Sequence, residues 1–556
     1  MPDSIDTVYH VLKLKEVELY QRDDQHYGDY EKLVVTSNLL FRFSRPRCIV
    51  KPRSTVEVQT VIEQSKKQNV RLTIRCGGHS YAGFSTALET NNDILMDLRN
   101  MNTVELDALN DTVTIGAGCQ WGEVYRCLIN NSLDGRIING GRCPWVGVGG
   151  FMLGSGLGPF TRTLGMGSDT LLGAAIVTAD GEVVTVAKDD DFESKEGQLF
   201  WALQGAGQAN FGVVTQMKLK VERLKSGGTK VVGGRFQWFP KDNNIEELRN
   251  TMNDLYKAKW PERITIDTTW ICDLREKTSD GVRFTVYYDG RKEDYDKLID
   301  KYVKHEDVNK QLKKRALEEP STRFLYETLE RQWFDESKRF FAENKSYRIF
   351  AAFAFDRRQI KSNVDKITAI LQQEMKSFRE LYTGENVNLD IVWIHTGGKA
   401  SDRKPQDTAY YWRRALYHTY IEILWEDKWM ELNMRGFMAK LKKKLRPYSL
   451  NKAAAFVNFP DRELAKGAYE RVYFGENRHK LRKVKETWDK DNYFSWAQSI
   501  QLPKDAVDDV TVDVDMEDYE NQTDRLAQDL WHSSNWQHRH IQNFDVEMSN
   551  LESLAI

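Results

Sequence analysis

Glycine is concentrated in one part of this sequence. Residues 140–173 contain 11 glycines in 34 positions, whereas the 36 glycines of the 556-residue chain would place about two there. Each glycine raises the entropic cost of ordering the chain, so such a cluster needs a compensating role. Successive backbone N–H groups without side chains can enclose a pyrophosphate, which requires several donors and little steric bulk. The cluster therefore predicts close backbone approach to a phosphate-bearing ligand.

A second glycine turn comes earlier in the chain, directly after an expected strand. Its sequence, Arg75-Cys76-Gly77-Gly78-His79-Ser80, places the histidine at the rim of whatever the backbone encloses. Neither turn fits GxxxxGK[ST], and no clean GxGxxG follows the first strand, so the pattern disfavours a P-loop or a Rossmann dinucleotide fold. Taken alone, Gly-Gly-His is more typical of a structural histidine, but the later glycine cluster makes the combination specific.

Both helices and strands are expected to position these turns. Between residues 50 and 220, short β-branched segments alternate with polar helical ones, which indicates an α+β fold. A helix is expected at 56–68, and the Ala179-Asp180-Gly181 segment has the chemistry of a hairpin turn. The strands expected in this half are 71–74, 94–98, 113–115, 174–178 and 183–186.

Beyond residue 220 the pattern changes to strand-like runs separated by charged helical stretches. Several runs interleave apolar and polar residues, which predicts an antiparallel sheet with one buried face, partly covered by helices. The strands expected here are 233–239, 265–271, 282–288, 348–355 and 389–395, and the helices are 295–303, 321–341 and 360–382.

The two glycine turns and several later motifs resemble the berberine bridge enzyme family, within the larger group of p-cresol methylhydroxylase (PCMH) and vanillyl-alcohol oxidase type flavoproteins. The resemblance spans roughly residues 43–502. Residues 75–85 resemble the family's pyrophosphate-binding loop, and residues 141–150 resemble the loop that carries a cysteine anchor. Further matching motifs are 154–158, 164–169, 199–207, 210–214, 473–477 and 492–500.

The resemblance implies an FAD that is attached twice. His79 matches the residue bonded to the 8α-methyl group of the flavin, and Cys143 matches the residue bonded to its C6. Val146 matches a position where valine is typical of the oxidases, so dioxygen is the expected electron acceptor. The positions assigned to cofactor binding are Arg75, Cys76, Gly77, Gly78, His79, Ser80, Cys143, Val146, Gly147, Gly149, Gly150, Gly154, Ser155, Gly212, Val213, Val214, Asn492 and Tyr493.

The sequence departs from the family where a catalytic base is commonly found. Phe456 and Phe459 occupy positions that often carry tyrosine, and phenylalanine cannot remove a proton. Residues 417–425 resemble a substrate-domain strand, whose alternation places His418, Tyr420 and Glu422 on one face. These three residues are the candidate catalytic groups, with Tyr420 or Glu422 as the expected base.

The resemblance also implies a domain organisation. A PCMH-type FAD-binding domain at 43–222 would return at 449–502 and enclose a substrate-binding domain at 223–448 with a helix-covered antiparallel sheet. An N-terminal extension (1–42) and an acidic C-terminal extension (503–556) lie outside the matched region. The basic run 442–446 is expected on a solvated helix face, and Asp513, Asp515 and Glu517 lack the glycine of a calcium loop, so no metal is expected.

The implied reaction is hydride transfer from a small-molecule substrate to the flavin, followed by reoxidation with dioxygen to give hydrogen peroxide. The substrate is expected to be a specialised metabolite, with or without oxidative cyclisation. Oxidation of a carbohydrate at its anomeric carbon, a redox-neutral cyclisation on the same flavin scaffold, and a non-enzymatic carrier that retains the fold are the alternatives.

Composition and charge indicate which binding partners and which cellular compartment to expect. The 80 basic and 82 acidic residues give a net charge of −2, which gives no reason to expect nucleic acid or an anionic membrane. The longest apolar run, 349–355, is far shorter than the ~20 residues of a membrane span. Neither a leader-like apolar stretch in the first twenty residues nor CxxC spacing among the six cysteines is present, so a cytoplasmic, reducing location is expected. Secretion is the alternative if the sequence is that of a trimmed precursor. The oligomeric state stays open.

Overall fold

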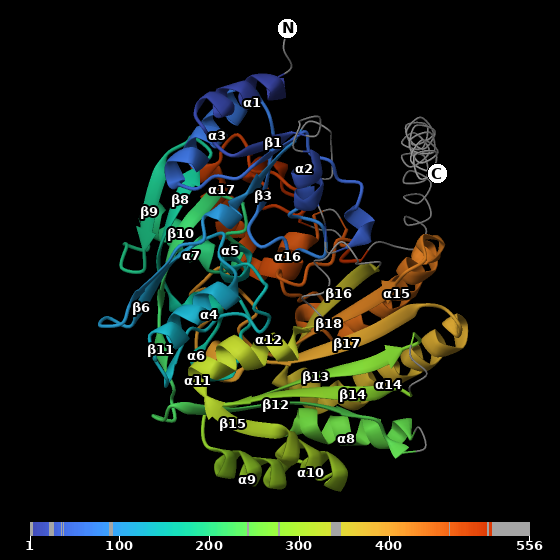
Figure 1. Ribbon diagram of the computed structural model, residues 1–556. Helices are drawn as coiled ribbons and strands as arrows, with labels where there is room; N and C mark the ends of the chain where they lie inside the picture. The colour runs from blue at the N-terminus through green and yellow to red at the C-terminus, as the bar shows by residue number, and fades with distance from the viewer. Residues whose placement is uncertain are drawn as a thin grey trace, which may run out of the picture.

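The chain folds around two large hydrophobic cores, which Figure 1 shows as an upper and a lower part. The structure is a computed structural model, and it describes residues 4–21, 27–34, 36, 38–87, 93–241, 244–275, 279–334, 346–465, 467–508 and 511–513. One core is built from the N-terminal half together with the C-terminal segment, and the other from the middle of the chain. The mixture of helices with antiparallel and parallel strands confirms the predicted α+β class.

Two sheets support the first core. The four-stranded sheet has the order β1-β2-β4-β3, and its strands β2, β4 and β3 are parallel. The five-stranded sheet, β5-β6-β10-β8-β9, is antiparallel throughout. Their strands are β1 Leu19–Gln21, β2 Cys48–Val50, β3 Leu72–Arg75, β4 Ile94–Asp97, β5 Val104–Asp107, β6 Thr112–Gly116, β8 Leu171–Thr178, β9 Val183–Ala187 and β10 Gly212–Lys220.

Local sequence signals account for these elements. The helix α3 (Thr55–Lys67) begins where the Ser54 hydroxyl accepts a hydrogen bond from the Glu57 N–H at 3.2 Å. The strands β8 and β9 form the hairpin predicted around Ala179-Asp180-Gly181, and Gly181 takes a positive φ of 78° that favours glycine. The parallel strands end on the same edge, so the loop after β3 starts at the carboxyl end of the sheet, where ligands commonly bind.

A seven-stranded antiparallel sheet forms the lower part of Figure 1. Its order is β15-β12-β14-β13-β17-β18-β16. Helices α8 (Ile245–Lys257), α14 (Arg357–Tyr382) and α15 (Glu431–Leu445) contribute apolar side chains to the core on one face. The strands are β12 Lys230–Trp238, β13 Ile264–Asp273, β14 Gly281–Tyr288, β15 Ala316–Pro320, β16 Tyr347–Asp356, β17 Val387–His395 and β18 Ala415–Trp425.

The expectation that this sheet has only one buried face is wrong for two of its strands, the inner strand β17 and the edge strand β16. Every residue of β16 and β17 is buried. The face opposite the helices packs against the first unit, where Val392 and Ile394 share a cluster with Leu157 and Phe456. On that face Arg348 pairs with Glu422 and His418 bonds Tyr410, so these polar side chains are buried and partnered within the protein although their alternation resembles that of a solvated face.

The first and the last long described segments of the chain pack in the core of the first unit. Helix α1 (Ser4–Leu14) places Ile5, Val8 and Leu12 in its core, and the C-terminal segment contributes Phe494 and Ile500. In the expected helix at 321–341, α11 (Ser321–Arg323) runs through a π-helical turn into α12 (Leu329–Gln332), and residues 335–341 lie outside the described part.

The prediction of a solvated face holds only in part for the basic run at the end of α15, because Lys443 is exposed but Lys442 and Arg446 are not. Lys442 is buried and its Nζ lies 2.8 Å from Asp461 Oδ2, while Arg446 donates to both carboxylate oxygens of Asp513 at 2.9 and 2.8 Å. The first acidic residue of the supposed calcium loop is therefore an ion-pair partner. Asp515, Glu517 and the rest of the acidic extension lie outside the described residues.

Among the helices that the structure describes, none is both long enough and apolar enough to cross a bilayer.

Candidate active site

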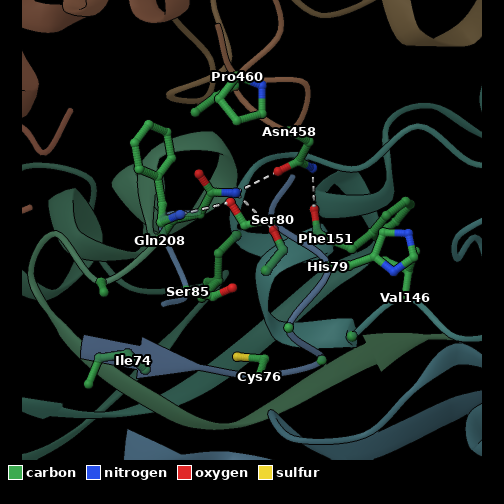
Figure 2. Close-up of a pocket in the computed structure, with 18 of the residues that line it drawn as sticks. Ile74, Cys76, His79, Ser80, Ser85, Val146, Phe151, Gln208, Asn458 and Pro460 are labelled. Atoms are coloured by element: carbon green, nitrogen blue, oxygen red, sulfur yellow. Dashed lines mark hydrogen bonds between the residues drawn. The ribbon is translucent and has the colours of Figure 1, made fainter. Parts of the chain in front are cut away.

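A cavity of about 320 Å³ lies between the first unit and the seven-stranded sheet. The predicted cofactor positions that line it are Cys76, Gly77, Gly78, His79, Ser80, Cys143, Val146, Gly147, Gly150, Gly212, Val213 and Val214. Figure 2 shows His79 and Val146 on one side of this cavity, and Gln208 and Asn458 on another. No aspartate or glutamate is among the described residues that line it.

The two glycine turns meet directly. A Cβ added at Gly77 would lie 2.4 Å from the Gly147 nitrogen, and a Cβ at Gly147 would lie 2.3 Å from the Gly77 nitrogen. Real Cβ atoms do not approach backbone so closely, so only glycine at both positions allows this contact. The turns are seventy residues apart in sequence, and their mutual packing brings His79 and Cys143 to the lining of one cavity.

Both predicted anchors are held by neighbouring side chains. The Tyr81 hydroxyl lies 2.8 Å from His79 Nε2, and the Tyr81 ring stacks on Phe350 with its centroid 5.1 Å away. Cys143 is buried and follows Arg142, whose Nε donates to Asp267 Oδ2 at 2.6 Å. Residues 350 and 267 belong to strands β16 and β13, so the seven-stranded sheet supports both anchors.

A pair of amides closes another side of the cavity. Gln208 Nε2 donates to Asn458 Oδ1 at 2.5 Å and to the Gly150 carbonyl at 3.0 Å, and Asn458 Nδ2 donates to the Phe151 carbonyl at 3.0 Å (Figure 2). Neither of these amides, nor Arg142, was predicted from the sequence. Their only sequence signal is that each lies inside or next to a matched motif.

Of the three candidate catalytic residues on β18, only Tyr420 lines the cavity. Its ring lies 4.6 Å from Phe459 and 6.1 Å from Phe350, centroid to centroid. Phe456 and Phe459 line the same cavity, with their centroids 5.4 Å apart. The residues at the family's tyrosine positions therefore face the cavity, and they are aromatic without an ionisable group.

Glu422 does not line the cavity, so its predicted catalytic role does not fit the structure. Its Oε1 lies 3.1 Å from Arg348 Nη1, and both side chains are buried. The alternation of the strand places Glu422 on the same face as Tyr420, but it does not show which residues of that face reach the cavity. A carboxylate already paired with a buried guanidinium is a poor base, because protonation would break the pair.

His418 also lies outside the cavity lining. Its Nε2 is 2.6 Å from the Tyr410 hydroxyl, which itself donates to the Trp412 carbonyl at 3.1 Å. Burial lowers the pKa of His418 to about 3, so the ring is neutral at physiological pH. The predicted catalytic role is therefore replaced by a structural one.

Six predicted cofactor positions lie outside the cavity lining. Arg75 pairs with Asp97 at 2.6 Å, and Gly149 packs against Cys76 Sγ. Tyr493 donates from its hydroxyl to the Val70 carbonyl at 3.0 Å. The six positions are Arg75, Gly149, Gly154, Ser155, Asn492 and Tyr493.

Burial keeps the thiols of three other cysteines protonated. Burial raises the pKa of Cys76 and of Cys119 to about 12 and that of Cys127 to about 11, so these thiols stay protonated. Cys119 and Cys127 do not line the cavity. Within the described residues, no group of three or more histidine, cysteine or acidic side chains is arranged to hold a metal ion.

Comparisons with known proteins agree with this geometry. An "FAD binding domain" family model matches residues 46–187, and a "Berberine and berberine like" family model matches residues 455–501. The chain is 27% identical to berberine bridge enzyme-like 21 of Arabidopsis thaliana and 26% identical to tetrahydroberberine oxidase of Argemone mexicana. Each alignment covers 82% of this chain and 83% of the relative.

The fold has solved counterparts. The berberine bridge enzyme of Eschscholzia californica superposes with a TM-score of 0.73 at 20% identity, covering 91% of this chain and all of that one. A berberine bridge enzyme-like protein of Physcomitrella patens gives a TM-score of 0.71, also at 20% identity, and covers 89% of this chain and 99% of that one.

The residues present fit an FAD in the cavity. A Cβ added at Gly150 would meet no atom within 4 Å although Gly150 lines the cavity, so the space in front of its backbone is open to a bound group. The matched FAD-binding region contains both glycine turns. The chain thus has the FAD-binding and berberine-like domains of an FAD-dependent oxidoreductase, and over four fifths of its length it is similar to berberine bridge enzyme-like proteins.

Proposed function

We propose that this protein is an oxidase in which FAD is attached to both His79 and Cys143. The observation that carries the proposal is the direct packing of Gly77 on Gly147, which brings an imidazole and a thiol to one cavity lining. The flavin, when bound, supplies the capacity to accept a hydride from a substrate C–H and to pass the electrons on. Dioxygen is the proposed acceptor, with hydrogen peroxide as product, because Val146 lines the cavity at the position where valine is typical of the oxidases.

The chain's own residues bind the cofactor and remove the substrate proton. The glycine turns offer backbone N–H groups for the pyrophosphate, since no side chain stands in the way. Tyr420 is the proposed base, because it is the strand residue on this face that reaches the cavity and carries an ionisable hydroxyl. Its role is to take a proton from a substrate O–H or N–H as the C–H bond breaks.

The lining points to a flat or largely apolar substrate. Tyr420, Phe456 and Phe459 form an aromatic wall, and Gln208 and Asn458 contribute neutral amides. A wall of this kind suits a specialised metabolite with an aromatic ring, and the adjacent amides offer hydrogen bonds to its substituents. A carbohydrate oxidised at its anomeric carbon is the alternative substrate, because sugars also stack on aromatic rings.

One observation favours a second candidate function. The described lining holds no carboxylate, and Phe456 and Phe459 replace the commonly found tyrosines. A redox-neutral cyclase would need no strong base, so the same scaffold would serve it. Anaerobic addition of substrate separates the two functions: bleaching of the flavin supports the oxidase, and turnover without bleaching supports the cyclase.

The test of the proposed function is the visible spectrum and intact mass of denatured protein. Yellow colour that survives acid precipitation is expected, with a mass increase equal to FAD less the two hydrogens that each tether loses when it forms. H79A and C143A should each keep one attachment, and the double variant should release the flavin on denaturation. C127A is the matched control, because Cys127 does not line the cavity. A colourless precipitate from wild-type protein would refute covalent attachment. A screen for peroxide release then identifies the substrate.

A further inference from the structure

Two buried arginine–carboxylate pairs lie near the two glycine turns: one joins the later turn to the seven-stranded sheet, and the other lies within the sheet beside Tyr81, which follows the earlier turn. One joins Arg142 to Asp267 of β13, and the other joins Arg348 of β16 to Glu422 of β18. A buried ion pair is weak evidence of stability, because removing two charges from water costs about as much as their attraction returns. Stability alone therefore does not explain why one such pair lies near each of the two proposed tethers.

The first pair fixes the backbone next to Cys143. Arg142 donates from Nε to Asp267 Oδ2 at 2.6 Å, from Nη2 to Asp267 Oδ1 at 3.3 Å, and from Nη1 to the Leu157 carbonyl at 2.5 Å. Asp267 Oδ1 also accepts from the His395 N–H at 2.9 Å. The guanidinium is thus held at three points. Because Arg142 and Cys143 are consecutive, the direction in which Sγ projects depends on this arrangement.

The second pair reaches His79 through one tyrosine. The Arg348 Cζ lies 4.8 Å from the centroid of the Tyr81 ring, and the Tyr81 hydroxyl lies 2.8 Å from His79 Nε2. A cation over a ring holds the ring in place. With Glu422 at 3.1 Å from Arg348 Nη1, a continuous chain of contacts runs from strand β18 to the imidazole.

Asn38 ties the same two segments together through their main chains. Its Nδ2 donates to the Tyr81 carbonyl at 2.8 Å and to the Arg348 carbonyl at 2.9 Å, and its Oδ1 accepts from the Arg348 N–H at 3.2 Å. Asn38 is fully buried. The position of Tyr81 relative to Arg348 is therefore fixed by hydrogen bonds as well as by the ring contact.

We propose that the seven-stranded sheet directs covalent flavin attachment, with Arg348–Glu422 positioning His79 and Arg142–Asp267 positioning Cys143. Each pair controls its own tether and not the other. The inference rests on the proposed function, since it presupposes two tethers. Arg142, Arg348, Asp267 and Glu422 are positioning residues, because they act through the side chain or backbone of the residue that forms the bond.

The attachment step itself balances with dioxygen as oxidant. Each tether forms one bond between the protein side chain and a flavin carbon, and it releases one proton from the side chain and one from that carbon. The two electrons of the broken C–H bond stay on the flavin. Dioxygen removes them and, with two protons, becomes hydrogen peroxide.

The experiment uses full-length protein in two single-tether backgrounds. C143A leaves only the His79 tether, and H79A leaves only the Cys143 tether. In each background, R348M and R142M are introduced, and acid-stable flavin per protein is followed at intervals after induction. We expect R348M to slow attachment about tenfold in C143A and to leave it unchanged in H79A, because misplacing one reacting group affects only its own bond. R142M should give the reverse pattern.

A matched control comes from a third buried arginine. Arg413 donates to both oxygens of Asp169 at 2.8 Å, and its Cζ lies 5.1 Å from the Tyr410 ring centroid, yet neither residue lines the cavity. R413M should therefore leave attachment unchanged in both backgrounds. R348K should recover part of the His79 rate, since it keeps the charge above Tyr81. E422Q, which preserves the side-chain volume, provides the same readout if R348M does not fold.

The outcomes separate the two proposals. Wild-type protein without acid-stable flavin would refute the double tether itself. If both single-tether backgrounds are flavinylated, equal effects of R348M and R142M on both tethers, or no effect on either, would overturn the positioning role. A reciprocal pattern with unchanged R413M would establish it.

Discussion

Arg348 Nη1 lies 3.1 Å from Glu422 Oε1, and the two side chains are 0% and 4% exposed. Strand alternation places Glu422 on the same face as Tyr420, which makes both residues candidates for a base. The structure distinguishes them: the carboxylate neutralises a buried guanidinium, and the phenol lines the cavity. Of the two candidate bases on this strand face, Glu422 thus serves the buried packing of the sheet.

Removing one member of this pair should destabilise the protein more than removing both. E422L leaves the Arg348 charge buried without its carboxylate, which we expect to lower the free energy of unfolding by about 3–5 kcal/mol. R348M/E422L replaces the pair by apolar side chains of similar volume and should recover most of that loss. Urea unfolding followed by tryptophan fluorescence measures both. A double variant less stable than E422L would contradict the assignment of these two residues as a buried ion pair.

Tyr420 is expected to be essential for substrate oxidation. Y420F removes the hydroxyl and keeps the ring that packs 4.6 Å from Phe459. With any substrate that bleaches the flavin, we expect the anaerobic reduction rate to fall about a hundredfold, the lower end of the range for general base catalysis. Stopped-flow absorbance measures this rate. Y410F is the control, because Tyr410 bonds His418 outside the cavity lining and its variant should reduce at nearly the wild-type rate. Wild-type kinetics in Y420F would exclude Tyr420 as the base.

His418 should make folding stability depend on pH. Burial lowers its pKa to about 3, whereas an exposed histidine titrates near 6.5. Below about pH 6.5 the unfolded chain therefore binds a proton that the folded protein does not yet bind. The stability associated with the neutral ring is complete above about pH 6.5 and is lost as the pH falls towards 3, by up to about 1.4 kcal/mol per pH unit.

H418Q removes this titration and keeps a polar group near Tyr410. Its free energy of unfolding should fall less steeply than that of the wild type between pH 6.5 and 4.5, in parallel urea titrations. His395 has its pKa lowered well below the usual value by burial and contributes in the same direction in both proteins. Identical slopes would show that His418 is protonated in the folded state at these pH values.

The elements of the fold were largely predictable, because local patterns determine them. The hairpin turn at Gly181 and the long helix after Asp356, whose carboxylate accepts from the Gln359 N–H at 2.8 Å, follow from residues close in sequence. The two-sided burial of β16 was not predictable, because Arg348 looks like a solvent-facing residue until its partner 74 positions later is known. Lys442 and Asp461 raise the same difficulty.

The candidate site was likewise predictable only in part. The positions of His79 and Cys143 in one cavity lining agree with what the glycine motifs predict, since glycine marks where backbones must approach. Gln208 and Asn458 were missed, because a single amide has no spacing that distinguishes it. His418 and Glu422 were assigned to catalysis because alternation identifies a strand face and cannot identify which residues on that face reach a cavity.

The contact between the glycine turns offers a matched pair of substitutions. G77A places a methyl group 2.4 Å from the Gly147 nitrogen, so the turns must separate. We expect its thermal unfolding midpoint to fall and acid-stable flavin to be lost, because both anchors are displaced.

G150A adds its methyl group where no atom lies within 4 Å, on a residue of helix α5 (Val148–Leu153). In a helix, alanine is favoured over glycine by about 1 kcal/mol, so G150A should unfold no earlier than the wild type. Its methyl group nevertheless enters the cavity lining and should lower flavin loading. Full flavin content in G150A would place the bound ring elsewhere, and an unchanged unfolding midpoint in G77A would contradict the close packing of the two turns.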